Sequence, residues 1–187
     1  SNGNLTHANQ PSSRVDGTMW VSSGKWFYMG DADISNTANP YGIVSDADDG
    51  LGVVHSGANA WMVFGPGTSS PHTVFNTVFN NNHSSRVSDA ITAYDETEDK
   101  FCIALDADNK KVWFGVWNEG DSQMNWMDSS GTVRTSDEPG LGTNETYTIT
   151  GDAWAAISQH DNAPTLNFDF GQLGFTGGPS LPSGFTG

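Results

Sequence analysis

The spacing of apolar residues most constrains this chain, because they come in short runs separated by Gly, Pro, Asn, Asp and Ser. Gly (22) and Pro (8) are frequent, and no window is rich in Ala, Leu, Glu and Lys together, so long helices are disfavoured. Short runs of β-branched and aromatic residues bounded by turn formers are typical of strands. The sequence predicts an all-β protein with strands at 13–21, 25–34, 41–45, 51–55, 60–64, 86–94, 101–106, 111–117, 153–159 and 165–170.

The 187 residues predict a single domain over 1–187. Two stretches, 65–85 and 118–144, are rich in polar residues and Gly, and we expect long loops there. Loops of such length in a compact domain are more often functional than accidental. Residues 171–187 predict an irregular closing segment or the start of a linker. Because the chain begins at Ser1 without Met, we expect a segment of a longer or processed protein.

The stretch FCIALDADNKKVWFGVWNEG, residues 101–120, predicts a hairpin. Its turn lies at 108–110, where Asp and Asn tolerate the left-handed backbone of a tight turn. Alternation along the second strand places Trp113 and Trp117 on one face. The opposite face carries Val112, Phe114 and Val116. Since both faces are apolar, we expect a central strand, covered by a second sheet on one side and by a loop or a ligand on the other.

Charge excludes several classes of partner. The chain has 22 acidic and 7 basic residues, a formal net charge of −15, so phosphate backbones and anionic membrane surfaces would be repelled. No apolar run approaches the ~20 residues of a membrane span. Cys102 has no partner for an internal disulfide and, between Phe101 and Ile103, is expected in the core.

Three stretches together resemble a SPRY domain, a β-sandwich of the concanavalin-like class. SSGKWFYMG (22–30) is similar to the early GKWYFEV strand of the family, and residues 101–120 are similar to its GVALDLDNGTIYFYKNG hairpin. AWAAISQHDNAPTLNFDFGQLGF (153–175) is similar to its closing pattern. The opening SNGNLTHA resembles the SPRY-like modules of tailed-phage structural proteins. Where the family hairpin usually has Gly after Asn, this chain has Lys110.

The resemblance implies a two-sheet antiparallel sandwich, a concanavalin-like or SPRY-like jelly roll without chemistry of its own. It implies a virion surface protein, extracellular, such as a tail fibre or spike. We expect recognition of a host-surface glycan or protein. The alternatives are a structural decoration or assembly module that contacts neighbouring virion subunits, and a polysaccharide-acting enzyme. An oligomer is compatible with these roles, whereas nucleic-acid binding and membrane insertion are not expected.

Catalysis is not expected from the sequence. Glycoside hydrolysis with retention needs two carboxylates about 5 to 5.5 Å apart. Glu96 and Glu98, in the acidic run 95–99, have suitable spacing but no flanking strand pattern, so a solvated turn is favoured. The five His residues lie in no known nucleophile motif.

The stretch SDADDG (45–50) has the oxygen-rich character that Ca²⁺ favours. Its candidate ligands are Asp46, Asp48 and Asp49, but Gly50 stands one position too early for an EF-hand loop. An acidic turn is therefore preferred over a Ca²⁺ site, and no cofactor is expected. One Cys and scattered His give no zinc-ligand spacing.

Two Trp residues suggest where a ligand binds. Trp61 lies in NAWMVFG and Trp126 in QMNWMD, next to Asn125 and Asp128. An indole ring can stack on the C–H face of a sugar while Asn and Asp bond its hydroxyls, and the same set also suits a protein contact. These four residues are the predicted ligand-binding site. The alternative is that both Trp side chains pack onto the sandwich and hold their loops.

Overall fold

The structure is a computed structural model that describes residues 3–6, 17–21, 23–31, 40–44, 60–64, 75–80, 85–91, 100–149, 153–157, 165–169 and 178–186. Side chains are described at 23–27, 29, 100, 102–149 and 178–186. The described chain is mostly antiparallel β-sheet, with one short helix, α1 (Glu138–Leu141). The prediction of an all-β fold is confirmed at that level.

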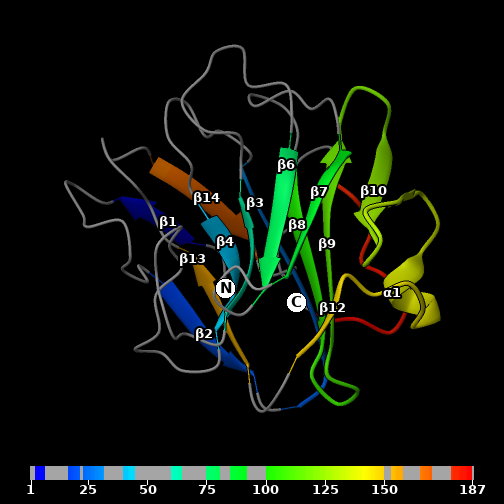
Figure 1. Ribbon diagram of the computed structural model, residues 1–187. Coiled ribbons are helices and arrows are strands. Elements are labelled where there is room, and N and C mark those ends of the chain that lie inside the picture. Colours follow the sequence, from blue (N-terminus) through cyan, green and yellow to red (C-terminus); the bar gives the residue numbers. More distant parts are fainter. Residues whose placement is uncertain are drawn as a thin grey trace.

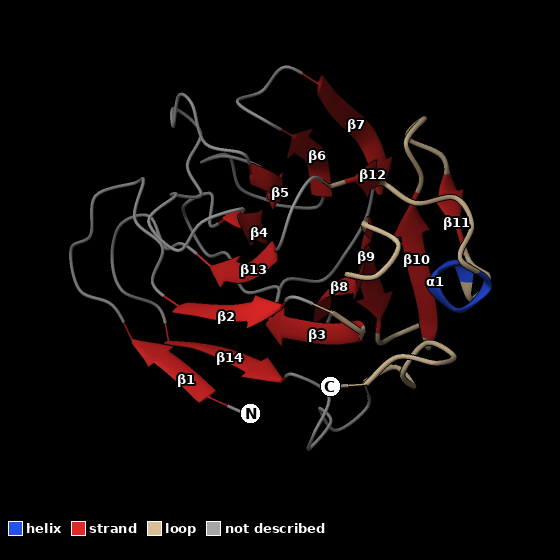
Figure 2. Cartoon of the chain, turned by 90° about the horizontal axis from the view of Figure 1, so that it is seen from below, coloured by secondary structure: helices blue, strands red, loops and turns tan. Residues whose placement is uncertain are grey.

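The strands belong to two sheets (Figure 1). The larger sheet has the order β1 (Gly3–Thr6), β14 (Thr165–Asp169), β3 (Lys25–Asp31), β8 (Lys100–Asp106), β9 (Lys111–Asn118), β10 (Gln123–Met127) and β11 (Val133–Arg134), and β12 (Tyr147–Thr148) also pairs with β9. The smaller sheet has the order β2 (Gly17–Val21), β13 (Ala153–Ile157), β4 (Pro40–Val44), β5 (Ala60–Phe64), β6 (Phe75–Asn80) and β7 (Ser85–Ile91). Figure 2 shows α1 beside β10 and β11, at the opposite end of the larger sheet from β1.

Most predicted strands are present with ends shifted by a few residues, and 60–64 matches β5. The predicted strand at 51–55 lies outside the described residues. The two predicted long loops are wrong: 65–85 contains β6, and 118–144 contains β10, β11 and α1. These strands escaped prediction because they are short and lie between turn-forming residues, so that polar neighbours mask their alternation. Strands β1 and β12 were also missed.

The predicted hairpin is confirmed as β8 and β9, which pair from Lys100↔Trp117 to Asp106↔Lys111. Within the turn, Lys110 takes the left-handed backbone, with φ of 58°, and not Asp108 or Asn109. Asn109 is held differently: its backbone N and its Nδ2 donate to the Asp106 carboxylate at 2.9 and 2.8 Å. The left-handed residue of the turn is therefore Lys110 and not the expected Asp108 or Asn109, because the Asp106 carboxylate holds Asn109 in place.

Strand β9 is buried on both faces, as predicted. On one face Val112, Phe114 and Val116 are at most 1% exposed, and the Phe114 ring meets Tyr147 edge-on, with 6.4 Å between ring centroids. On the other face Trp113 is fully buried, and its Nε1 donates to the Thr143 carbonyl at 2.7 Å.

The core on the Trp113 face unites four strands. Its buried members are Phe27, Met29, Cys102, Ala104, Trp113, Trp126 and Phe185. Register explains the grouping, because Phe27 faces Ala104, which faces Trp113 in the next strand. Cys102 is fully buried, which confirms its predicted place in the core, and burial raises the pKa of its thiol.

Along one edge of β9 the paired strand changes from β10 to β12 near Phe114. It pairs with β10 from Asn118 to Phe114 and with β12 at Val112 and Lys111. At the junction the buried Thr146 hydroxyl accepts from the Phe114 backbone N at 3.0 Å and donates to the Met127 carbonyl. One hydroxyl thus joins β9 to the end of β10 at the point where β12 takes over.

We expect Thr146→Val to lower the free energy of unfolding by about 2 kcal/mol, since a buried backbone N–H loses its acceptor. Thr146→Ser keeps the hydroxyl and loses one methyl, so its cost is about 1 kcal/mol. Urea denaturation of both variants checks this. A valine variant no less stable than the serine variant would contradict the role of the hydroxyl.

Candidate functional site

A pocket of about 450 Å³ lies between the β9–β10 hairpin and residues 178–186, which we name the closing segment. Its apolar lining comes from Phe27, Trp117, Met124 and Trp126. Its remaining lining comes from two irregular stretches, 135–137 and 179–183. In Figure 1 the closing segment, in red, runs beside β10 and α1.

The apolar side of the pocket follows from the register of β9 and β10. Trp117 pairs with Met124 and Gly115 pairs with Trp126, so alternation places Met124 and Trp126 on the same face as Trp117. Trp126 is 2% exposed and meets Phe27 edge-on at 6.4 Å between ring centroids. Trp117 and Met124 are half-buried. The pocket therefore has a buried aromatic floor and a wall that solvent can reach.

Gly115 makes this packing feasible. A Cβ at this position would lie 2.6 Å from the Asn125 carbonyl oxygen, 2.6 Å from Met124 Cε and 2.8 Å from Trp126 Cε3. Such distances are well inside van der Waals contact. Both pocket-lining side chains of β10 consequently depend on the missing side chain in β9.

The closing segment is fixed to the start of β3. The backbone N of Thr186 donates to the Lys25 carbonyl at 2.9 Å, and Phe27 N donates to the Thr186 carbonyl at 2.8 Å. These bonds form a parallel bridge at Trp26. The adjacent Phe185 is 6% exposed and packs edge-on against Trp113, with 6.2 Å between ring centroids.

A second anchor ties the closing segment to α1. Asp137, the N-cap of α1, accepts from Gly140 N at its Oδ1 (3.1 Å) and from Ser183 N at its Oδ2 (3.0 Å). Gly142 ends the helix with a left-handed φ of 69°. Asp137 therefore joins the two irregular stretches that line the pocket.

The rim of the pocket is rich in hydroxyl groups. Thr135, Ser136, Ser180 and Ser183 are all exposed. No hydrogen bond joins any of these four hydroxyls to another residue of the described ranges. They are therefore available to a ligand.

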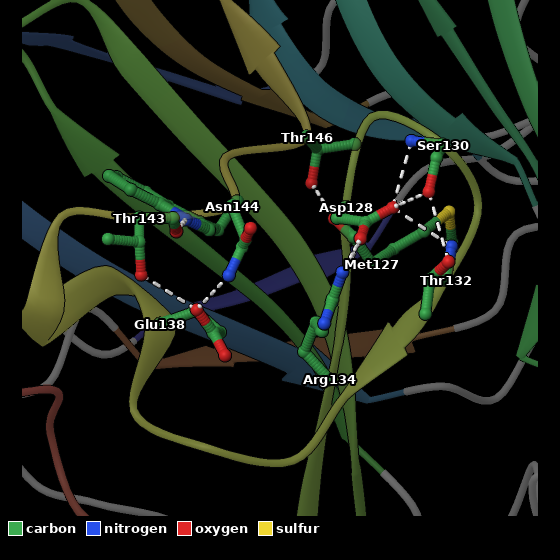
Figure 3. A network of polar contacts seen from close by, with 10 residues as sticks. Met127, Asp128, Ser130, Thr132, Arg134, Glu138, Thr143, Asn144 and Thr146 are labelled. Carbon is green, nitrogen blue, oxygen red and sulfur yellow. Dashed lines mark hydrogen bonds and ion pairs between the residues drawn. The ribbon is translucent and has the colours of Figure 1, made fainter.

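Asp128 stabilises the β10–β11 turn behind the pocket (Figure 3). Its Oδ1 accepts from Ser130 N (2.8 Å), Ser130 Oγ (2.6 Å) and Thr132 N (2.9 Å). Its Oδ2 accepts from Arg134 Nε at 2.9 Å and lies 2.8 Å from Nη2. Burial raises the pKa of Asp128, but the hydrogen bonds from Ser130, Thr132 and Arg134 outweigh it and lower the pKa to about 2.

A separate buried carboxylate, Glu138, orders the return from α1 to β12. It is 6% exposed, and its Oε2 accepts from Thr143 Oγ1 at 2.8 Å and from Asn144 Nδ2 at 2.7 Å (Figure 3). Asn144 has a left-handed φ of 51°. This turn delivers the Thr143 carbonyl to the Trp113 indole, so α1 and the aromatic core are coupled.

Of the four predicted ligand-binding residues, the structure describes the side chains of Asn125, Trp126 and Asp128, and of these three only Trp126 lines the pocket. Trp126 is not on an exposed loop but on β10, where it forms the pocket floor. Asn125 is on the same strand, and alternation places it on the opposite face. Asp128 is 5% exposed, and its carboxylate already accepts from its own turn and from Arg134. Trp61 is on β5, in the other sheet, and its side chain lies outside the described part.

Pocket residues missed from the sequence include Trp117, Asp137 and the stretch 179–183. The sequence predicts that a loop or a ligand covers the face of β9 that carries Trp113 and Trp117. The closing segment covers Trp113, whereas Trp117 lines the pocket. Asp137 carried a local signal, since an Asp before Glu-Pro is typical of a helix N-cap.

The predicted Ca²⁺ candidates Asp46, Asp48 and Asp49, and the acidic run 95–99, lie outside the described residues. Within the described ranges no three His, Cys, Asp or Glu side chains are grouped to hold a metal ion. No helix in those ranges has the length and apolar character needed to cross a membrane.

Comparison with known proteins adds no assignment: no family model matches the chain, and no curated protein matches it.

We expect Gly115→Ala to destabilise the protein by about 1 to 3 kcal/mol, because the added methyl overpacks β10. Gly120→Ala is the matched control, since its Cβ would meet only Asn118 Oδ1, at 3.5 Å. Chemical denaturation gives the stabilities, and near-ultraviolet circular dichroism reports the Trp environment. Equal stabilities of the two variants would contradict the packing argument.

The pKa of Asp128 predicts a loss of stability in acid. A carboxyl whose pKa is lowered from 3.8 to about 2 on folding stabilises the protein above pH 4 and loses this contribution as pH falls through about 2. Between about pH 5 and pH 2 the stability advantage of wild type over Asp128→Asn should shrink by about 2 kcal/mol. Urea denaturation across this range measures it. A difference independent of pH would show that the Asp128 network is not charge-dependent.

Proposed function

We propose that this chain is a non-catalytic recognition module and that the pocket between the β9–β10 hairpin and the closing segment binds a glycan. The observation that carries the proposal is the half-buried Trp117 and Met124 facing a hydroxyl-rich rim. Aromatic rings stack on the C–H faces of sugars, while side-chain hydroxyls and a carboxylate bond sugar hydroxyls. The pocket volume of about 450 Å³ falls in the range of small-molecule sites.

A binding role is favoured over catalysis by the charged groups of the pocket. Asp137 is the one carboxylate among the lining residues that the structure describes. Glycoside hydrolysis generally employs a pair of carboxylates flanking the scissile bond. Asp137 also has a local task, because each of its oxygens accepts a backbone N–H.

We further propose that the two sheets stack as a SPRY-like sandwich, a concanavalin-like jelly roll. Support comes from the sequence resemblance and from the central β8–β9 hairpin. The burial of Val112, Phe114 and Val116 also supports it, since a second layer must cover that face.

The resemblance to tailed-phage modules supports a place on the virion surface, with a host-surface glycan as the partner. The competing proposal is an assembly module that contacts neighbouring subunits. Its support is the exposure of two large apolar side chains, Leu141 (68%) and Leu181 (40%). Such residues are common at contacts between subunits, although single exposed Leu residues are also ordinary.

A glycan array that includes polysaccharide extracts from candidate hosts tests the proposal. We expect wild type to bind specific glycans and Trp117→Ala to lose at least about ten-fold in affinity, as hot-spot aromatic truncations commonly do. Trp26→Ala is the matched control, because Trp26 is also half-buried but does not line the pocket.

Absence of glycan binding by wild type would overturn the recognition proposal and favour assembly. Binding that survives Trp117→Ala would retain glycan recognition and reject the pocket.

A further inference from the structure

We propose that the pocket selects saccharides that carry an amino group and rejects those that carry carboxylate or sulfate. This inference rests on the proposed glycan-binding function and specifies its ligand class. The charged side chain among the described residues that line the pocket is acidic.

Among the described residues that line the pocket there is no Lys, Arg or His, whereas Asp137 is present. Two nearby cations are engaged elsewhere. Arg134, three residues before Asp137, lies 2.8 Å from Asp128 Oδ2. Lys25 is 3.2 Å from Asp106 Oδ2 and 5.6 Å from the centroid of the Phe185 ring. An anionic sugar would therefore meet a carboxylate without a free basic partner.

Asp137 is well placed to accept from a ligand. Each of its oxygens holds one backbone N–H, Gly140 N on Oδ1 and Ser183 N on Oδ2. A carboxylate oxygen can accept two hydrogen bonds, so one position remains on each oxygen. Asp137 is also exposed and lines the pocket, and its two bonds from backbone N–H groups fix the orientation of the carboxylate.

An ammonium group matches this acceptor better than a hydroxyl does. A hydroxyl and an ammonium both form a charge-assisted hydrogen bond to a carboxylate. The ammonium adds the attraction between opposite charges, which a neutral hydroxyl lacks. The formal net charge of −15 adds a long-range field that favours cationic ligands and disfavours anionic ones. Selectivity thus combines attraction of one ligand class with repulsion of the other.

The test compares three hexasaccharides with the same β-1,4-linked glucose-type backbone: glucosamine, N-acetylglucosamine and glucuronic acid. Titration calorimetry at mildly acidic pH keeps the amines protonated. We expect the glucosamine hexamer to bind most tightly and the glucuronic acid hexamer not to bind. Added salt should weaken binding of the glucosamine hexamer and leave that of the N-acetylated hexamer unchanged.

Two charge-matched variants separate the pocket from the general field. Asp137→Asn should weaken binding of the glucosamine hexamer about five-fold, the upper range for an exposed ion pair. Asp121→Asn removes the same charge from the exposed β9–β10 turn, outside the pocket, and should leave affinity unchanged. Asn is itself a good N-cap, so α1 is expected to remain folded.

The inference is overturned if the glucuronic acid hexamer or the N-acetylated hexamer binds at least as tightly as the glucosamine hexamer. It is also overturned if both Asn variants lose affinity equally, because the field alone would then explain binding. In these cases a loss with Trp117→Ala would still support the proposed function. If neither these hexamers nor any arrayed glycan binds, the proposed function itself fails.

Discussion

The architecture around β9 follows from one constraint: a strand that is apolar on both faces must be covered on both. Water exclusion from Trp113 and Phe114 stabilises the fold only if different elements pack on the two sides. Phe114 has Tyr147 on its side. Trp113 has Phe185, and its indole N–H is satisfied by the Thr143 carbonyl. The closing segment therefore completes the core, through Phe185, in addition to lining the pocket.

The residues outside the sheets have complementary tasks. Thr146, just before β12, joins β9 to β10 through one hydroxyl, Asp128 closes the β10–β11 turn, and Glu138 orders the return from α1. Each of these polar side chains is buried and hydrogen-bonded, as low-dielectric surroundings require. The pocket consequently lies on elements that are held by internal bonds, and the hydroxyls of its rim are exposed.

Sequence reasoning was most accurate where a pattern depends on local chemistry. Alternation in 111–117 and turn residues at 108–110 were enough to predict the β8–β9 hairpin and its two apolar faces. It failed for Trp126, because five residues between turns show too little alternation to reveal β10. The pocket itself brings together residues far apart in the chain, from Phe27 to Ser183, and the pairing of Lys25 with Thr186 anchors the closing segment. No local pattern encodes such a pairing, so the site could be found only from the fold.

The Lys25–Thr186 pairing also bears on when the pocket can form during synthesis. Chains emerge from the ribosome with the N-terminal part first. The edge of β3 at Lys25 and Phe27 must therefore wait for almost all of the described chain before Thr186 reaches it. The β8–β9 hairpin, whose partners are close in sequence, can form much earlier. The pocket would therefore be completed late in folding, because the closing segment that lines it is synthesised after β3, β9 and β10.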